Sequence, residues 1–191
     1  MKYLSWVGTC LIWACLHGCA YGATPHDKVH KSALFLKMER GTCSGTAVGP
    51  HVLLTASHCM TKGKVLAING WSPKVISVRH DGADHALVVV DLTFNRPARV
   101  ASQSPSVGDV VFIWGNPEGF NDLLRYGRVS GAEGVTLLDL NAYFGDSGAG
   151  VFNEQGQLVG VVSSLAGSPE FHQVGMFPMA FTDIQLRESG L

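Results

Sequence analysis

Charge of either sign is scarce in this sequence, and neither sign dominates. Charged residues make up 15% of the 191 residues, and 14 Lys and Arg against 15 Asp and Glu leave a formal net charge of −1. A nucleic-acid-binding protein calls for a basic stripe, so the composition gives no support for that class. Hydrophobic residues reach 46%, which is enough for a packed core and argues against a disordered chain.

Long apolar runs are missing after residue 25, so no later segment reaches the length that spans a membrane. The one apolar stretch lies at the start, where Lys2 precedes Tyr3–Leu16 and small residues follow. This order is typical of a signal peptide, which we predict over residues 1–20. Leu16-His17-Gly18-Cys19 also resembles a bacterial lipoprotein box, in which cleavage after residue 18 leaves a lipid anchor at Cys19. Both readings predict an exported protein, secreted or periplasmic.

Cysteine is scarce outside this leader. Three of the five cysteines lie within the first 19 residues, and Cys43 and Cys59 remain as a pair. In an oxidising compartment such a pair forms a disulfide, whereas in a reducing one it stays as two buried thiols. The count alone leaves both states open.

Sustained helical periodicity is also lacking beyond the leader. Short runs rich in Val, Ile, Leu and Phe alternate with Gly, Pro, Asn and Ser, which is typical of β-strands and turns. We expect strands at 33–36, 45–48, 51–54, 64–68, 74–78 and 86–92, and then at 109–114, 124–130, 135–140, 149–152, 157–163 and 174–181. Closed antiparallel barrels remove exposed sheet edges. The pattern therefore predicts an all-β fold of two six-stranded antiparallel β-barrels with a short C-terminal helix at 182–188.

The predicted domain covers residues 25–191. Its first barrel spans about 30–95 and its second about 108–182. The polar segment 96–107, which holds Pro97 and Pro105, is the expected linker between them.

One Gly-rich stretch, Gly145-Asp146-Ser147-Gly148, carries a serine with little bulk around its hydroxyl. Glycine permits a tight turn and a close approach of substrate, and backbone N–H groups in such a turn can hold an oxyanion. The same letters also fit a plain turn between two strands.

Two further stretches supply the partners that a nucleophilic serine needs. His58 follows the apolar run 52–54 and the small residues after it, and Asp84 stands before the apolar run 86–90. Serine becomes nucleophilic when a base takes its proton, and imidazole can do so near neutral pH. A carboxylate orients that imidazole. His85 is expected to point away from Asp84, as a surface or packing residue.

These stretches resemble the signatures T-A-x-H-C, D-x-A-L and G-D-S-G of the chymotrypsin-like (trypsin-fold) serine peptidases. The resemblance runs from about Ala33 to the C-terminus. It implies Ser147 as nucleophile, His58 as general base and Asp84 as orienting acid, with the oxyanion hole formed by the N–H groups of Gly145 and Ser147. It also implies a Cys43–Cys59 disulfide, which would contribute about 3 kcal/mol for a loop of 16 positions.

Gly115-Asn116-Pro117-Glu118-Gly119-Phe120 is similar to the HtrA-like branch of that family. Members of this branch often carry a peptide-binding, PDZ-type domain after the peptidase, and some form trimers. We expect no such domain before Leu191, and the sequence leaves the oligomeric state open. Asp146 stands where many relatives pair the carboxylate with a newly released N-terminal amine, and its partner here is also left open.

The position of the substrate pocket in that family predicts which side chain is preferred before the cleaved bond. Its floor lies six residues before the nucleophile, at Asn141, and its walls would come from Ser163, Leu165 and Gly175. Since Asn141 is uncharged, we expect no strong preference for Arg or Lys, because that preference uses a carboxylate in the pocket. Leu165 favours small or medium apolar side chains.

The sequence therefore predicts a serine endopeptidase that acts on proteins or peptides without metal or organic cofactor, and that meets a membrane only through Cys19. A catalytically silent binding module of the same fold is the alternative. A metal-dependent hydrolase built on 80–85 lacks one ligand, because Gly82 occupies a histidine's place. An α/β-hydrolase fits poorly, because Ala149 replaces the last glycine of its G-x-S-x-G elbow.

Overall fold

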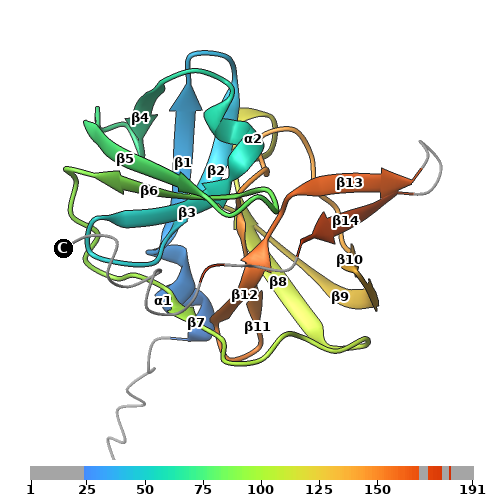
Figure 1. Ribbon diagram of the computed structural model, residues 1–191. Coiled ribbons are helices and arrows are strands. Elements are labelled where there is room, and N and C mark those ends of the chain that lie inside the picture. The colour runs from blue at the N-terminus through green and yellow to red at the C-terminus, as the bar shows by residue number, and fades with distance from the viewer. Residues whose placement is uncertain (1–23, 168–171, 178–180, 182–191) are drawn as a thin grey trace, which may run out of the picture.

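The computed structural model describes residues 24–167, 172–177 and 181, and within them the chain is mostly β (Figure 1). The predicted leader, Cys19 and the predicted C-terminal helix lie outside the described residues. In the described residues three short helices accompany the strands: α1 (Pro25–His30), α2 (Ser57–Met60) and the 3-10 helix η1 (Pro117–Gly119). No helix in the described ranges is long and apolar enough to cross a membrane.

The first sheet has six strands, as predicted. Its strands, in order across the sheet, are β4 (Val65–Ile68), β1 (Ala33–Met38), β2 (Thr42–Ala47), β3 (Val52–Ala56), β6 (His85–Val90) and β5 (Val75–His80). All neighbouring strands are antiparallel. The sheet curls, but no ladder joins β4 to β5 among the described residues. Within the described residues the sheet is thus a curled half-barrel, with β4 and β5 as its edge strands.

The second sheet has eight strands in the described ranges, not six. Its strands, in order, are β13 (Ser164–Gly167), β14 (His172–Met176), β10 (Val135–Asp139), β9 (Leu123–Glu133), β8 (Val110–Gly115), β11 (Gly150–Asn153), β12 (Gln157–Val161) and β7 (Arg99–Val100). Two of them were missed. β7 comes from the predicted linker and pairs in parallel with β12, and β13 is separated from β12 by a break at 162–163.

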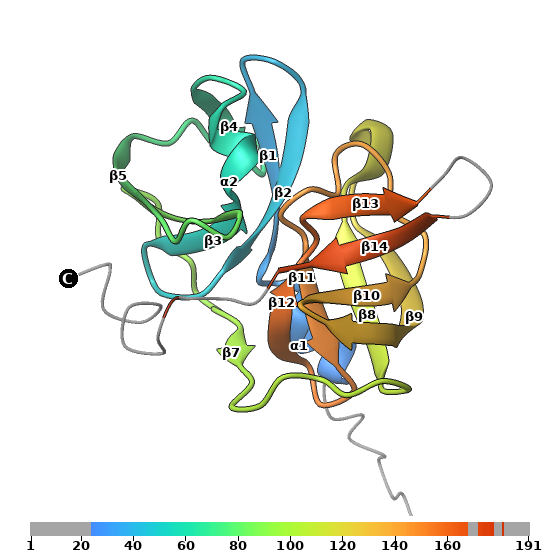
Figure 2. The same cartoon turned by 45° about the vertical axis from the view of Figure 1, so that its right-hand side comes forward.

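The hydrophobic core of the described residues consists of three clusters. Two of them are each formed within one sheet. Leu36 and Leu53 represent the first, and Ile113 and Leu138 represent the second. The third cluster draws on both sheets and centres on Phe112, which stacks on Phe152 at 5.6 Å between ring centroids. This shared cluster packs against both sheets, which lie side by side in Figure 2.

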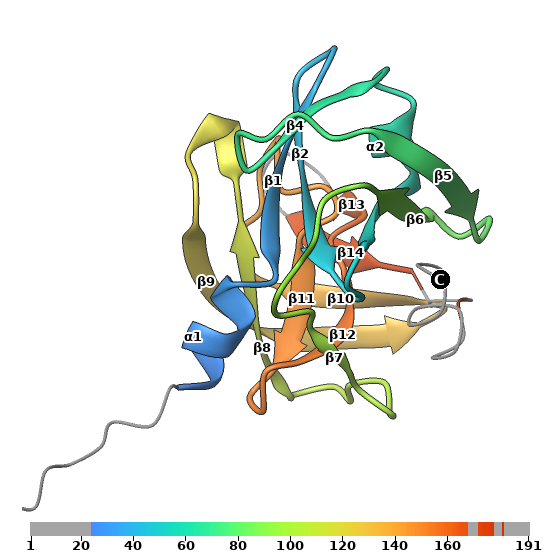
Figure 3. The ribbon, with the colours of Figure 1, turned by 90° about the vertical axis from the view of Figure 1, so that its left-hand side faces the viewer.

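α1 was not predicted, although the sequence holds its signal. Thr24 and Asp27 form a capping box, and Pro25 occupies the first helical turn, where it is tolerated. Hydrogen bonds donated by the Thr24 side chain and backbone lower the pKa of Asp27. Val29 is buried in the shared cluster, and the His26 ring meets Phe112 edge-on at 4.8 Å. α1 therefore docks beside β8 and β9 (Figure 3).

Candidate active site

His58 and Asp84 meet because their strands are neighbours. β3 and β6 pair with Ala56 opposite His85, so the residues just beyond these positions lie side by side. His58 Nδ1 lies 2.9 Å from Asp84 Oδ2 and 3.2 Å from Oδ1, and the His58 backbone N–H donates to Oδ1 at 2.9 Å. A proton on Nδ1 that faces the carboxylate leaves Nε2 with a lone pair that can accept a proton.

A buried pair behind Asp84 shapes its turn. Asp84 has φ +68°, which is uncommon for a residue with a side chain. Asp81 Oδ1 accepts hydrogen bonds from the backbone N–H groups of Ala83 and His85, and its Oδ2 lies 2.6 Å from His85 Nδ1. The His85 side chain is fully buried, so it is a packing residue and not a surface residue. This turn holds Asp84 toward His58.

Ser147 lies on a turn of the second sheet that contacts the first sheet. It is half-buried in the turn between β10 and β11, and its carbonyl accepts a hydrogen bond from the Ser44 N–H of β2 at 2.8 Å. Gly148 has φ +84°, and a Cβ there would lie 2.2 Å from Thr55 Oγ1 and 2.3 Å from the Ser44 carbonyl. Only glycine therefore lets this turn pack so close to the first sheet. In the described residues no hydrogen bond joins the Ser147 hydroxyl to His58.

The turn before Ser147 presents two unused N–H groups. The Phe144 carbonyl accepts a hydrogen bond from Glu118 N–H of η1 at 2.6 Å. Since a trans peptide directs its C=O and N–H to opposite sides, the Gly145 N–H points away from η1. Within the described ranges, the N–H groups of Gly145 and Ser147 donate to no other residue. The arrangement leaves both donors available for an incoming oxygen.

Gly145 could not be replaced without moving this turn. It has φ +103°, and a Cβ there would lie 2.3 Å from the Asn116 carbonyl. The Gly145 carbonyl accepts a hydrogen bond from the Ser44 hydroxyl at 2.9 Å, and Asn116 Nδ2 donates to that same hydroxyl at 2.9 Å. Neither Ser44 nor Asn116 was predicted as a site residue, because their contacts cross from one sheet to the other.

Asp146, whose partner the sequence left open, pairs with Arg125 of β9. Arg125 Nη1 and Nη2 donate to its two carboxylate oxygens at 2.6 and 2.5 Å, and Tyr143 N–H donates at 2.8 Å. The Asp146 side chain is fully buried, and that of Arg125 is 16% exposed. Gly115 makes room for the pair, since a Cβ there would lie 2.2 Å from Asp146 Oδ1. The ion pair therefore fixes the turn that carries Gly145 and Ser147.

Cys43 and Cys59 form a disulfide, with their Cα atoms 6.2 Å apart. Cys43 precedes Ser44, which bonds the Ser147 turn, and Cys59 follows His58. The bridge thus links β2, which contacts the Ser147 turn, to α2, which carries His58. The expectation of a disulfide is confirmed by the structure.

The comparison with known families agrees with this geometry. A family described as the trypsin-like peptidase domain matches residues 43–161, more than half of the chain. The chain belongs to the trypsin-like peptidase family. The predicted resemblance and fold class are thereby confirmed. A search of curated protein sequences found no match.

Solved structures show the same fold at low sequence identity. The serine endoprotease from Yersinia pestis superposes with a TM-score of 0.69 at 20% identity, over 80% of this chain and 61% of that one. The active form of the Rv3671c protease from M. tuberculosis gives a TM-score of 0.69 at 17% identity, over 83% of this chain and 80% of that one. An inactive form of the same protease gives 0.66 at 20% identity, over 80% and 86%. The peptidase thus spans less than two thirds of the Yersinia chain.

The residues predicted to line the substrate pocket lie in two parts of the structure, three of them at β13 and β14 and one beside Arg125. Ser163 N–H donates to the Gly175 carbonyl at 3.0 Å, and Ser164 pairs with Gly175, so three of the four predicted positions lie together at β13 and β14. Leu165 is 51% exposed there. Asn141 is exposed, and its carbonyl accepts a hydrogen bond from Arg125 Nη1 at 3.3 Å. The preference for apolar side chains stays a prediction.

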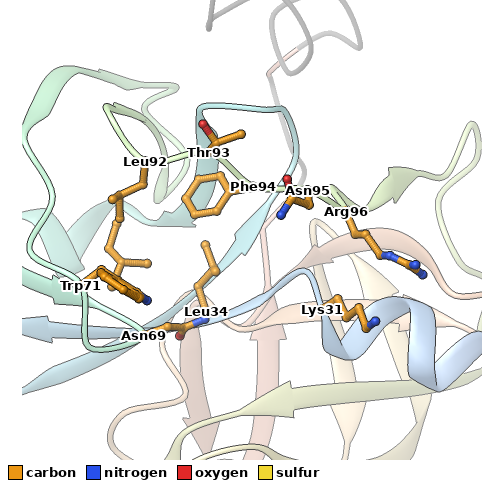
Figure 4. A pocket seen from close by; sticks show the side chains of 10 residues that line it. Lys31, Leu34, Asn69, Trp71, Leu92, Thr93, Phe94, Asn95 and Arg96 are labelled. Atoms are coloured by element: carbon orange, nitrogen blue, oxygen red, sulfur yellow. The ribbon is translucent and has the colours of Figure 1, made fainter.

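A cavity of about 490 Å³ lies elsewhere, between the first sheet and the segment 92–96 (Figure 4). Buried Leu34 and Ile68 contribute to its lining, and Trp71, which is 72% exposed, lies at one end. Lys31 and Arg96 stand at the other end. None of the predicted catalytic residues lines this cavity, so it has no part in the triad.

In the part of the chain that the structure describes, no group of three His, Cys, Asp or Glu side chains is placed to bind a metal ion. In the stretch 80–85, His80 Nδ1 contacts the Ser57 hydroxyl and His85 faces Asp81. The side chains that a metal-dependent hydrolase would use are thus directed to other partners.

Proposed function

We propose that this trypsin-like peptidase is a serine endopeptidase with Ser147 as nucleophile, His58 as general base and Asp84 as orienting acid. One observation supports it most. The bond from His58 Nδ1 to Asp84 lies beside a turn whose Gly145 and Ser147 N–H groups are both free of acceptors in the described residues. Two neighbouring N–H groups without acceptors are what an oxyanion hole requires, and a turn that only connects two strands does not require them.

Each residue would have a defined step in the reaction. The Ser147 hydroxyl attacks the carbonyl carbon of the scissile peptide bond, while His58 Nε2 takes its proton. The Gly145 and Ser147 N–H groups stabilise the negative oxygen of the tetrahedral intermediate, where loss of one such donor typically costs 10²–10³ in kcat. His58 then gives its proton to the leaving amine, which departs and leaves an acyl-enzyme.

Water completes the cycle by the same route in reverse. His58 removes a proton from the attacking water, the second tetrahedral intermediate collapses, and the proton returns to Ser147 as the acid product leaves. Asp84 holds the imidazole in one tautomer throughout both halves. The substrates would be proteins or peptides, with Asn141, Ser163, Leu165 and Gly175 shaping the site for a small or medium apolar side chain before the cut.

We also propose export of the chain through its N-terminal segment, either with removal of residues 1–20 or with lipid attached at Cys19. The Cys43–Cys59 disulfide supports an oxidising compartment, because such bonds persist mainly outside the cytosol. The alternative of a catalytically silent binding module rests on one observation. The described residues show no hydrogen bond from the Ser147 hydroxyl to His58, although such bonds are often long before substrate binds.

Covalent labelling with a fluorophosphonate probe tests the proposal. The oxidised wild-type protein should react, and Ser147→Ala and His58→Ala should abolish labelling. Ser164→Ala and His80→Ala are matched controls that should leave it intact, because Ser164 lies on β13 and His80 contacts Ser57 rather than Asp84. A folded wild-type protein that fails to label would contradict an assembled triad and favour the binding module.

A further inference from the structure

Four of the chain's 14 basic residues gather on one face, although the whole chain is nearly neutral. Lys28 of α1, Arg96 and Arg99 line one hollow of about 400 Å³. Arg96 also lines the neighbouring cavity of Figure 4, together with Lys31 at the end of α1. We call these four residues the basic face.

The basic face carries no internal neutralisation. All four residues are exposed, and in the described ranges none of their side chains makes an ion pair or a hydrogen bond. No acidic residue lines either hollow. The nearest acid along the chain, Asp27, keeps its negative charge, but its carboxylate accepts hydrogen bonds from the Thr24 cap and forms no ion pair with any of the four residues. An external anion is therefore the counter-charge that this face lacks.

The position of the face indicates which anion. Thr24 is the first described residue, and the chain before it contains the apolar run Tyr3–Leu16 and Cys19. From Cys19 to Thr24 an extended chain reaches at most about 17 Å. With lipid attached at Cys19, as proposed above, α1 and with it Lys28 would lie at the headgroups of the bilayer, and this step of the inference rests on that proposal.

The catalytic end stays clear of that surface. In the three ribbon views α2, which carries His58, lies at the end of the molecule opposite to α1 and β7 (Figures 1, 2 and 3). A bilayer against the basic face would leave the site open to substrate.

We infer that the basic face binds the anionic surface of a lipid bilayer. Each Lys or Arg held near an anionic leaflet strengthens binding roughly fivefold. Four of them together strengthen it by up to several hundred-fold, and this attraction falls with salt because charges are screened. The inference is independent of the proposed catalysis, since it uses none of the triad residues.

Sedimentation with lipid vesicles tests it, using the protein purified after export. Vesicles of phosphatidylglycerol and phosphatidylcholine in equal parts are compared with vesicles of phosphatidylcholine alone, at about 0.1 M and about 1 M salt. The four-site variant Lys28→Gln, Lys31→Gln, Arg96→Gln and Arg99→Gln removes the face. We expect it to lose the preference for anionic vesicles, with a fall in low-salt affinity of about 100-fold or more.

A matched variant separates the face from net charge. Lys37→Gln, Lys64→Gln, Lys74→Gln and Arg79→Gln remove four exposed cations whose side chains have no partner in the described residues, so the charge change is the same. This variant should lose less than about tenfold. Equal losses in both variants, no preference of the wild type for phosphatidylglycerol, or equal binding of poly-glutamate would each overturn the inference. Any contribution of the N-terminal segment is common to all arms.

Discussion

Replacing Arg125 by Met should damage both stability and catalysis. The change keeps a side chain of similar length but removes the two donors that hold the Asp146 carboxylate at 2.6 and 2.5 Å. Because Asp146 is fully buried, its charge would keep only the Tyr143 N–H as a partner. Removing one member of a buried pair typically costs 3–5 kcal/mol, and we expect about that loss in the free energy of unfolding.

The catalytic effect should exceed what instability explains. Asp146 adjoins Ser147, and its contact with Tyr143 N–H spans the turn that presents the Gly145 N–H. If the turn relaxed, the N–H group of Gly145 or of Ser147 would move out of place. Loss of one such donor lowers kcat by roughly 10²–10³. Fluorophosphonate labelling rates, measured well below the unfolding midpoint in urea, separate this effect from loss of folded protein.

Two further variants make the experiment decisive. Arg125→Met combined with Asp146→Asn removes both charges, so stability should return to within about 1–2 kcal/mol of wild type. Arg128→Met, on the same strand and exposed, should change stability by less than about 1 kcal/mol. If the free energy of unfolding of Arg125→Met lies within about 1 kcal/mol of the wild-type value and the variant is labelled at the same rate, the ion pair does not position the turn.

Three other changes have sharp expectations. Cys43→Ala with Cys59→Ala should lower stability by about 3 kcal/mol in urea unfolding, the value for a loop of 16 positions; equal stability under oxidising conditions would contradict it. Gly148→Ala should abolish labelling and destabilise the fold, because its Cβ would lie 2.3 Å from the main-chain carbonyl of Ser44. Asp84→Asn should leave unfolding nearly unchanged yet lower kcat about 10⁴-fold, as loss of the orienting carboxylate does in the type case; a smaller loss than tenfold would remove Asp84 from the mechanism.

Short motifs in the sequence predicted the fold class, which is confirmed, and the triad that we propose. His58, Asp84 and Ser147 each stand in a local pattern of small and apolar neighbours, and the order of the three patterns is informative. The structure adds the bond from His58 to Asp84, which follows from the pairing of β3 with β6. Strand pairing of this kind is visible only once the register is known.

Arg125 and the supports of the turn escaped prediction for a different reason. Arg125 lies 21 positions before Asp146, in a strand whose pattern marks no residue as special. Its pairing depends on Gly115 leaving space and on the second sheet closing over both side chains. The Glu118 N–H that fixes Phe144 is a backbone group, and any residue except proline could supply it.

Of the elements that were not predicted, α1 has a signal in the sequence and β7 has none. The signal for α1 is the capping box that Thr24 and Asp27 form at its start. β7 had none, because two residues are too few for an alternating pattern and its pairing is supplied by β12. The number of strands in the second sheet was therefore beyond local sequence reasoning.

The pairing of Asp146 with Arg125 also separates two events that many trypsin-like enzymes join. Where a freshly cut N-terminus must supply the positive charge, processing and activity cannot be set independently. Here that charge comes from Arg125 of β9, so the contact of the Asp146 carboxylate needs no N-terminal amine. We therefore expect the Asp146–Arg125 ion pair to persist whether the segment before α1 is trimmed, lengthened or tethered.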